Sequence, residues 1–229
     1  MKKKMVVLTG AGVSAESGIQ TFRDGDGLWE NYRIEDVATP EAWDNNAQLV
    51  LDFYNMRRKQ VMQAQPNEAH HLLAQLQDQF DVQIITQNID DLHERAGSHH
   101  VLHLHGEILK KRCTIQSDCV ETAEEKMSLS QTPHGGMWRP HIVWFGEEVP
   151  MLEQAIQLTE QADIFLVIGT SLLVYPAASL VQFTAKHAQT WIIDPKIPAH
   201  LPASFKTIAQ PATTGMREYV NLISANKFL

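Results

Sequence analysis

Three features are scarce in this chain of 229 residues, and each absence excludes a class of protein. Two cysteines are too few for the disulfide framework of a small secreted domain. The 19 Lys and Arg residues are outnumbered by 27 Asp and Glu, so the net charge of −8 lacks the basic excess that binds nucleic-acid phosphates. No apolar run approaches the ~18 residues of a membrane span. We therefore expect neither a nucleic-acid partner nor a membrane partner.

The N-terminal apolar run, Met5 to Leu8, is shorter than the ~7 residues of a secretory signal, so it predicts a strand and a cytoplasmic protein. With 44% hydrophobic residues, the chain is long enough to bury one sizeable core. The length predicts one domain, 1–229. The sequence does not set the oligomeric state, and a monomer is compatible with it.

Short apolar runs rich in β-branched residues alternate along the chain with longer amphipathic stretches. This alternation is typical of βαβ units, and it predicts an α/β fold with a Rossmann-like, doubly wound, mostly parallel sheet. The expected strands are 5–9, 82–86, 101–104, 142–145, 164–168 and 191–194, and the expected helices are 40–62, 66–79, 89–96, 151–161 and 176–187.

Two stretches fit this alternation badly. Residues 22–79 place two successive helices between the first two strands, which predicts a helical insert near 22–80. Residues 106–139 are polar and contain both cysteines, and they predict a small irregular insert near 106–140. We interpret both as inserts in one domain, with a cleft between them and the sheet.

The first expected strand runs directly into a G-x-G-x-x-A turn that contains Gly10, Ala11, Gly12, Ser14 and Ala15. In a dinucleotide-binding turn, the glycines permit a tight turn and a close approach to a pyrophosphate, and the small last residue allows close packing at a helix N-terminus. A plain glycine turn would have the same sequence. The chain lacks the acidic residue that closes the second strand of ordinary NAD dehydrogenases, which argues against hydride transfer.

Polar residues follow two other expected strands, at the edge where open α/β sheets bind ligands. Capping of the next helix by Asn88 or Asp90 is an alternative explanation for the first group. An ordinary loop is the alternative for the second group, whose hydroxyls suit a ribose or a phosphate. The two groups are Gln87, Asn88, Ile89 and Asp90 after the second strand, and Gly169, Thr170 and Ser171 after the fifth.

His103 and His105 lie on one face of the third expected strand. Together with His93 they would supply three metal ligands, so a metal hydrolase is one alternative. A single His at the end of a strand, followed by Gly106 and facing the cleft, more naturally suits a general base that titrates near neutral pH.

Taken together, these motifs resemble those of the sirtuin family. The match extends from Met5 to about Val220 and keeps five motifs in order. The motifs are Gly-Ala-Gly-Val-Ser with Phe22 and Arg23, the run from Thr86 to His93, His103-Leu104-His105-Gly106, Phe145-Gly146-Glu147, and Gly169-Thr170-Ser171.

The resemblance implies an NAD-dependent protein-lysine deacylase that acts on acylated lysine side chains and releases nicotinamide and O-acyl-ADP-ribose. It implies that His105 deprotonates a ribose hydroxyl, that Asn88 orders ribose and water, and that Asp90 contacts the nicotinamide amide. The positions that match the family's cofactor contacts are Gly10, Ala11, Gly12, Ser14, Ala15, Phe22, Arg23, Gln87, Asn88, Ile89, Asp90, Gly169, Thr170, Ser171, Asp194 and Ala212, and those that match its substrate strand are Val143, Phe145 and Gly146.

Three departures from the family pattern are informative. Sirtuins commonly hold a structural zinc with two cysteine pairs, whereas this chain has Cys113 and Cys119 alone. His134 would be a makeshift third ligand, so we expect that zinc is absent. The cofactor loop lacks the family's Pro and Asp. Asp194 stands where an Asn is common, which leaves its contact with the adenosine ribose open.

One charged residue stands on the apolar stripe of the first expected helix. At ~100° per residue, Arg57 falls inside the stripe, whereas Arg58 at its edge and Lys59 off it suit a solvated face. A buried guanidinium needs a partner, and Tyr54 is the helical neighbour of Arg57. Together they would bind the carboxylate of a dicarboxylic acyl group. The pair resembles the Tyr-x-x-Arg of class III sirtuins, which remove succinyl and malonyl groups; pairing of Arg57 with Asp36 is the alternative.

Two other functions stay open on the sequence. ADP-ribosyl transfer uses the same NAD cleavage with another acceptor, and a non-catalytic module would bind NAD or acyl-lysine. The presence of His105, Asn88 and Asp90 argues against the module, because binding alone has no need of a base.

Overall fold

The computed structural model describes residues 2–20, 28–29, 32–116 and 118–225. Phe22 and Arg23, which match the family's cofactor loop, lie outside these described residues. Within the described part, no helix combines the length and the apolar character needed to cross a membrane.

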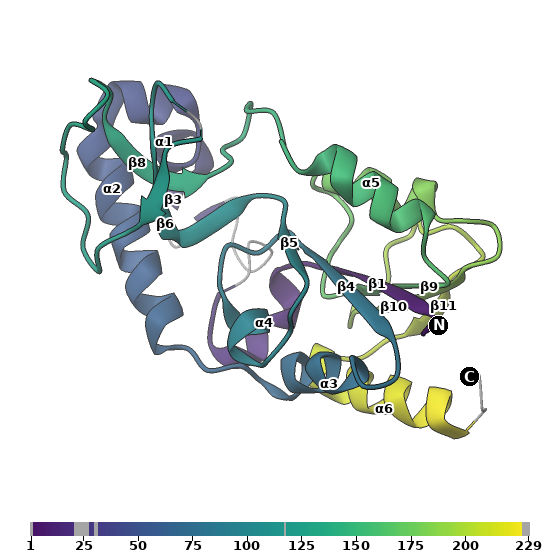
Figure 1. The fold of residues 1–229 in the computed structure, drawn as a ribbon. Helices are drawn as coiled ribbons and strands as arrows, with labels where there is room; N and C mark the ends of the chain where they lie inside the picture. Colours follow the sequence, from purple (N-terminus) through teal and green to yellow (C-terminus); the bar gives the residue numbers. More distant parts are fainter. Residues whose placement is uncertain (1, 21–27, 30–31, 117, 226–229) are drawn as a thin grey trace.

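The larger part of the molecule is built on a parallel sheet, which has six strands among the described residues (Figure 1). Numbered along the chain, these strands lie in the order 6-5-4-1-2-3, which is that of a Rossmann fold. The predicted fold class is therefore confirmed. From edge to edge the strands are β11 (Lys206–Ile208), β10 (Gln189–Ile193), β9 (Ile164–Ile168), β1 (Lys4–Thr9), β4 (Asp81–Thr86) and β5 (Val101–His103).

Helices cover both faces of this sheet (Figure 1). Strand side chains point alternately to the two faces, so Met5 and Val7 join one core cluster and Val6 and Leu8 join the other. Because both faces are covered, the central strands are continuous hydrophobic runs in the sequence. The first cluster is closed by α3 (Glu68–Leu76) and α6 (Ala212–Ala225), and the second by α5 (Leu152–Glu160) and the 3-10 helix η3 (Ala177–Phe183).

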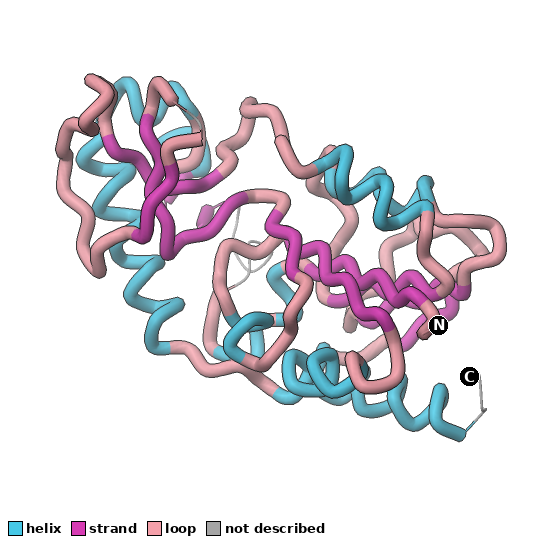
Figure 2. The backbone as a smooth tube through the Cα atoms, in the orientation of Figure 1, coloured by secondary structure: helices cyan, strands magenta, loops and turns pink. Residues whose placement is uncertain are grey.

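A smaller module lies beside the carboxyl end of the sheet, as Figure 2 shows. Its core joins one face of the long helix α2 to strands of an antiparallel sheet, although these segments lie far apart in the sequence. Thr39 caps α2 by accepting a hydrogen bond from Ala42 N, and Pro40 occupies the first turn, where its missing N–H costs nothing. The elements of the module are β2 (Leu28–Trp29), β3 (Tyr32–Arg33), α1 (Ile34–Val37), α2 (Pro40–Gln63), β6 (Gly106–Cys113), β7 (Val120–Thr122) and β8 (Trp138–Ile142).

Three expected elements differ in the structure. The helix expected at 89–96 is the single turn α4 (Leu92–Arg95). The helix expected at 176–187 is η3, where side-chain hydroxyls bond to carbonyls three residues earlier and compete with α-helical bonding. The strand expected at 142–145 ends with β8 at Ile142, because the N–H groups of the next residues bond to two different segments of the chain.

The position of Arg58 differs from the sequence prediction, which placed this residue on a solvated face. Its side chain is buried: Nε donates to Ile108 O at 2.8 Å and Nη1 donates to Asn55 Oδ1 at 2.7 Å. Arg58 thus fastens α2 to β6, whereas Lys59 is exposed as expected. Helical periodicity could not show this, because the carbonyl of Ile108 comes from a segment distant in the sequence.

Candidate active site

The loops that follow β1, β4 and β9 meet where the strand order of the sheet reverses. Ligands of open α/β sheets bind beyond the carboxyl ends of the strands at such a point. One cavity there is lined by all three loops and by the small module. The residues predicted to act in catalysis or cofactor binding that line this cavity are Gly10, Ala11, Ser14, Gln87, Asn88, Ile89, Asp90, His105, Gly169, Thr170 and Ser171.

The glycine turn after β1 packs directly against the turn after β9. Gly10 N donates to Ile168 O at 3.0 Å, and Gly12 N donates to Gly169 O at 2.8 Å. A Cβ on Gly12 would lie 2.6 Å from Gly169 Cα, so the backbones can approach this closely only without a side chain. Gly12 therefore brings two cavity loops together and does not line the cavity itself.

The turn after β1 does not lead directly into an α-helix. It continues as two short 3-10 turns, η1 (Ala11–Val13) and η2 (Ala15–Ser17), because Gly18 with φ of +85° ends the second turn. Ala15 is exposed and does not line the cavity, and its role in cofactor binding stays a prediction.

Ser14 connects the two polar side chains of the loop after β4. Its Oγ donates to Asp90 Oδ2 and accepts from Asn88 Nδ2, both at 3.1 Å, and all three residues are buried. Asp90 Oδ1 also accepts from Leu92 N at 3.1 Å, so Asp90 does bond to the start of α4. Burial raises the pKa of Asp90, and these two donors oppose that shift. The side-chain amide of Asn88 is thereby held in one orientation.

A further hydrogen bond joins the loops after β4 and β9. Gln87 Nε2 donates to Thr170 Oγ1 at 3.2 Å, and the same Oγ1 accepts from Leu172 N at 3.2 Å. These bonds fix the two loops relative to each other, so the cavity wall is positioned by the sheet.

His105 lines the cavity from the end of β5, with an orientation that suits a general base. Its Nδ1 lies 3.0 Å from the backbone oxygen of Gln87, and a carbonyl oxygen can only accept. Nδ1 therefore carries the hydrogen, and Nε2 keeps its lone pair. Burial lowers the pKa of His105 below its usual value, partly offset by the bond to Gln87. The ring is then neutral at neutral pH, as a base requires.

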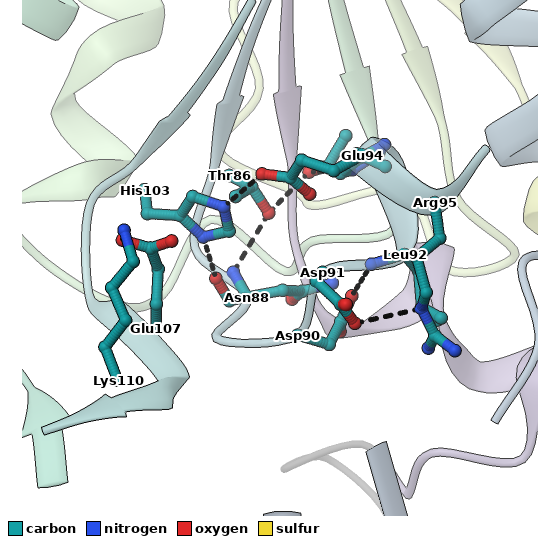
Figure 3. A network of polar contacts seen from close by, with 12 residues as sticks. Thr86, Asn88, Asp90, Asp91, Leu92, Glu94, Arg95, His103, Glu107 and Lys110 are labelled. Atoms are coloured by element: carbon teal, nitrogen blue, oxygen red, sulfur yellow. Dashed lines mark hydrogen bonds and ion pairs between the residues drawn. The ribbon is translucent and has the colours of Figure 1, made fainter. Parts of the chain in front are cut away.

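The other two histidines of the metal alternative have hydrogen-bond partners instead. His103 Nε2 lies 2.7 Å from Glu94 Oε1 (Figure 3), and His93 Nε2 lies 3.0 Å from Thr9 Oγ1. Within the described part of the chain, no three His, Cys, Asp or Glu side chains gather as metal ligands. The structure does not support a metal hydrolase built on these histidines.

Tyr54 and Arg57 of α2 line the same cavity from the side of the small module. Both are buried, and Arg57 Nη1 donates to Gln60 Oε1 at 3.1 Å. The Arg57 guanidinium carbon lies 5.2 Å from the centre of the Trp29 ring, within range of a cation–π contact. Burial raises the pKa of Tyr54, so its hydroxyl stays protonated. The cavity therefore places a phenol O–H and a guanidinium together.

Trp144 is a cavity residue that the sequence analysis missed. Its Nε1 donates to the Tyr54 hydroxyl at 3.1 Å. Its ring is held by the Arg139 guanidinium, whose carbon lies 3.2 Å from the ring centre, and Arg139 is paired with Glu147 at 2.6 Å. Glu147 also accepts from Trp144 N at 2.8 Å. An aromatic residue in an apolar run resembles any core residue, so no sequence signal marked it.

The remaining predicted residues divide between the cavity and other places. Val143, Phe145 and Gly146 line the cavity, although not as a strand. Asp194 is buried, and its Oδ1 accepts from Lys196 N in a turn at 2.8 Å. Ala212 begins α6, and neither Asp194 nor Ala212 lines the cavity.

The two cysteines are both free thiols in the small module. Cys113 is buried with its Sγ 3.2 Å from Thr132 Oγ1, and this hydrogen bond lowers the pKa of the thiol. Among the described residues, no third side chain joins Cys113 and Cys119 as a metal ligand. The residues present do not fit a structural zinc, which needs four ligands.

Comparison with known proteins decides the family. A model of the Sir2 family matches residues 10–176 of this chain. The chain belongs to the Sir2 family. The resemblance to the sirtuins is therefore confirmed.

Sir2 relatives match nearly the whole chain. An NAD-dependent protein deacylase of Helicobacter pylori is 51% identical over 218 residues, which cover 94% of this chain and 95% of the relative. One of Aggregatibacter actinomycetemcomitans is 56% identical over 196 residues, covering 85% and 94%.

Solved Sir2 structures have the same fold. A Sir2 homologue in complex with NAD superposes with a TM-score of 0.86 at 40% identity, covering 98% of this chain and 91% of the homologue. A Sir2 structure with a p53 peptide and NAD+ gives a TM-score of 0.82 at 30% identity, covering 98% and 95%.

Proposed function

We propose that this Sir2-family chain is an NAD-dependent protein-lysine deacylase in which His105 is the general base. The reaction class is that of its full-length relatives, which are named NAD-dependent protein deacylases. We assign the acyl preference to Tyr54 and Arg57, which would favour acyl groups ending in a carboxylate. One observation carries these roles: the base, the polar loop and the Tyr–Arg pair line a single cavity.

The polar side chains at the carboxyl end of the sheet suit the binding of NAD. Side chains of Gln87, Asn88, Asp90, Thr170 and Ser171 line the cavity and offer amides, hydroxyls and a carboxyl group for riboses and for a carboxamide. NAD would supply the ADP-ribose that accepts the acyl group and would lose nicotinamide.

The protein's own part in this reaction is orientation, proton removal and the exclusion of water. Ser14 fixes Asn88 and Asp90, and Gln87 O holds the His105 ring with its Nε2 lone pair free. Nε2 would take the proton of a ribose hydroxyl and hold it while the acyl group is transferred. Apolar cavity residues, Ile142 among them, would keep the reacting groups out of bulk water.

Trp144 explains how Tyr54 would act on the acyl group. Because the Trp144 N–H already donates to the Tyr54 oxygen, the hydroxyl hydrogen of Tyr54 is left for an acceptor in the cavity. Arg57 beside it adds the positive charge. A carboxylate at the end of a succinyl or malonyl chain would bind both groups. An acetyl group ends in a methyl group and has no terminal carboxylate for them to bind.

We expect Trp144→Phe to reduce desuccinylation more than deacetylation. The change removes one neutral hydrogen bond that orients the Tyr54 hydroxyl, a loss of about 0.5–1.5 kcal/mol or roughly two- to tenfold. The ratio of kcat/KM on matched succinyl and acetyl peptides is the measurement. Trp43→Phe is the control, because Trp43 packs against the Trp144 ring in the same cluster. Equal changes of the ratio in both variants would contradict this role for Trp144.

We also propose that the protein holds its small module without zinc. The module is held by an apolar cluster, by Arg58 and by a three-stranded sheet. The purified protein is expected to contain no stoichiometric zinc and to keep its melting temperature in chelator. Elemental analysis that finds one zinc per chain, lost together with stability on chelation, would show this to be wrong.

The domain organisation also stays a proposal. We propose one catalytic domain, 1–229, in which the two inserts form the small module together. The shared core of α2, β6 and β8 supports this, since neither insert buries its apolar face alone. A cytoplasmic location stays a prediction from the sequence, which does not set the oligomeric state.

The proposed function is tested by following nicotinamide release. Wild-type protein incubated with NAD and a succinyl-lysine peptide is expected to release nicotinamide only while peptide is present. Free lysine in the peptide then identifies deacylation. Nicotinamide release with ADP-ribose attached to a protein or peptide, and no deacylation, would instead favour ADP-ribosyl transfer.

A further inference from the structure

His103 is a buried titratable residue to which the mechanism above assigns no part. It lies at the end of β5, and its side chain is 9% exposed beneath the loop that carries Asn88 and Asp90. Figure 3 shows its ring between that loop and Glu94 of α4. A second, smaller cavity is also lined by His103, on the side of β6.

Both ring nitrogens of His103 face oxygens that can only accept. Nδ1 lies 3.1 Å from the backbone oxygen of Asn88, and Nε2 lies 2.7 Å from Oε1 of Glu94 (Figure 3). A backbone carbonyl has no proton to give. The Glu94 side chain is 40% exposed, and although partial desolvation raises its pKa, the hydrogen bond and charge of His103 lower it below its usual value, so this carboxyl is ionised. Both contacts are hydrogen bonds only if both ring nitrogens carry hydrogens. The ring is then an imidazolium with a positive charge.

The contrast with His105 supports this assignment. The two rings are anchored alike, with Nδ1 on the carbonyls of the consecutive residues Asn88 and Gln87. They differ at Nε2: that of His103 meets the carboxylate of Glu94, whereas His105 lines the substrate cavity. One histidine is therefore arranged as a charged donor to the loop, and the other as a neutral base.

The charged groups around His103 favour its charged form. Glu94 faces it from α4, Glu107 from β6 and Asp90 from the loop, while Lys110 is paired with Glu107 at 2.7 Å. His93, another titratable neighbour, is neutral because burial lowers its pKa well below the usual value. Burial alone would lower the pKa of His103 too, but its hydrogen bond and ion pair with Glu94 outweigh this and raise it.

We propose that His103, held as an imidazolium by Glu94, is a positioning residue that fixes the peptide carbonyl of Asn88 and thereby the Asn88 side chain in the cavity. This inference rests on the proposed function, since Asn88 is taken to act in the reaction. The backbone of Asn88 is then held at both its C=O and its N–H, because the N–H donates to Thr86 Oγ1 at 3.0 Å. Loss of either His103 proton replaces one of its two hydrogen bonds by two facing lone pairs.

If His103 has this role, the activity has an upper pH limit. The His103 charge is present below its pKa and is lost as the pH rises through it, so kcat is expected to fall at high pH. His105 acts in the opposite direction, because its base form is the active one and forms as the pH rises. A bell-shaped profile follows, with His105 setting the acid limb and His103 the alkaline limb.

The charge of His103 can be tested without any assay of activity. Imidazole nitrogen resonances of the wild-type protein are expected to show His103 with both nitrogens protonated at pH 7, the signal being assigned by its loss in His103→Gln. The side-chain amide signal of Asn88 is expected to shift over the pH range in which His103 titrates. A neutral His103 at pH 7 would overturn the proposal. So would an Asn88 amide signal that does not shift over the pH range in which His103 titrates.

Glu94→Gln tests the link to catalysis. Removing the carboxylate is expected to move the alkaline limb of kcat to lower pH by about 1–3 units, leaving the acid limb in place. Glu107→Gln is the matched control: it removes a carboxylate that also faces His103 but is bonded to Lys110, so its shift should be much smaller.

The possible outcomes separate this proposal from the function on which it rests. A purely structural role for Glu94 would lower the melting temperature and kcat at every pH without moving either limb, and this result would overturn the proposal. A wild-type protein that shows no NAD-dependent deacylation would refute the proposed function, and with it the catalytic part of this inference. The resonances of His103 and Asn88 would still decide whether the charged ring positions the loop.

Discussion

Replacing His105 by Ala is expected to abolish NAD-dependent deacylation while leaving the fold intact. The ring is held by a hydrogen bond to Gln87 O, and its Nε2 is the proposed base. Loss of a positioned base typically costs ~10²–10⁴-fold in rate. The measurement is kcat on an acylated peptide at saturating NAD, beside a melting curve.

The matched control for this change is His99→Ala, which removes an exposed histidine from the loop before β5. Wild-type turnover by a folded His105→Ala variant would refute the assignment of His105 as base. In the wild-type protein, kcat is expected to rise with pH through a His105 pKa that lies below the usual value for histidine, because burial favours the neutral ring. The acid limb should be missing from any activity that survives in His105→Ala.

Replacing Arg57 by Met is expected to remove most of the preference for acyl groups that end in a carboxylate. The change deletes a charge-assisted contact worth about 1.5–3 kcal/mol, or roughly ten- to a hundredfold in kcat/KM for desuccinylation. Deacetylation should change far less, because an acetyl group offers the guanidinium nothing to bind. Tyr54→Phe should act in the same direction but more weakly, since it removes one neutral hydrogen bond donor and keeps the ring.

The control for Arg57 is Lys59→Met, which removes an exposed positive charge from the same helix. Asp36, the alternative partner, is exposed in the structure and not paired with Arg57, so a structural Arg57 would act through its hydrogen bond to Gln60 and its contact with Trp29. Both activities and the melting temperature would then fall together in Arg57→Met. That result would remove Arg57 from acyl selection while leaving the deacylase itself in place.

The parallel sheet could be predicted because its strands are buried on both faces. Runs such as Ile164–Ile168 need no alternation, and each ends in a turn of small or polar residues. The meeting of the three loops followed from topology, since carboxyl ends of parallel strands share one edge. Gly10, Asn88 and Thr170 therefore entered the candidate site from the sequence alone and line one cavity in the structure.

The elements that were missed lack strong local signals. β11 (Lys206–Ile208) is three residues long and has one buried residue, Ile208. The second to fourth residues of α6 are two threonines and a glycine, which are poor helix formers. Gly215 is needed there because a Cβ would lie 2.3 Å from a side-chain carbon of Ile193. In both cases tertiary packing determines the element.

The parts of the site that were missed depend on contacts between distant segments. Trp144 orients Tyr54 although 90 positions separate them. The buried Arg58 side chain donates a hydrogen bond to a carbonyl of β6. His103 was weighed as a metal ligand because spacing places it beside His105. Only the positions of Glu94 and of the Asn88 carbonyl show that it is a hydrogen-bond donor.

The most direct test of the account is mass spectrometry of matched acetyl-lysine and succinyl-lysine peptides incubated with the wild-type protein, with and without NAD. We predict free lysine in both peptides only when NAD is present, together with nicotinamide and the corresponding O-acyl-ADP-ribose. Removal of the acyl groups without NAD, or intact peptides in its presence, would contradict the assignment of this cavity to NAD-dependent deacylation.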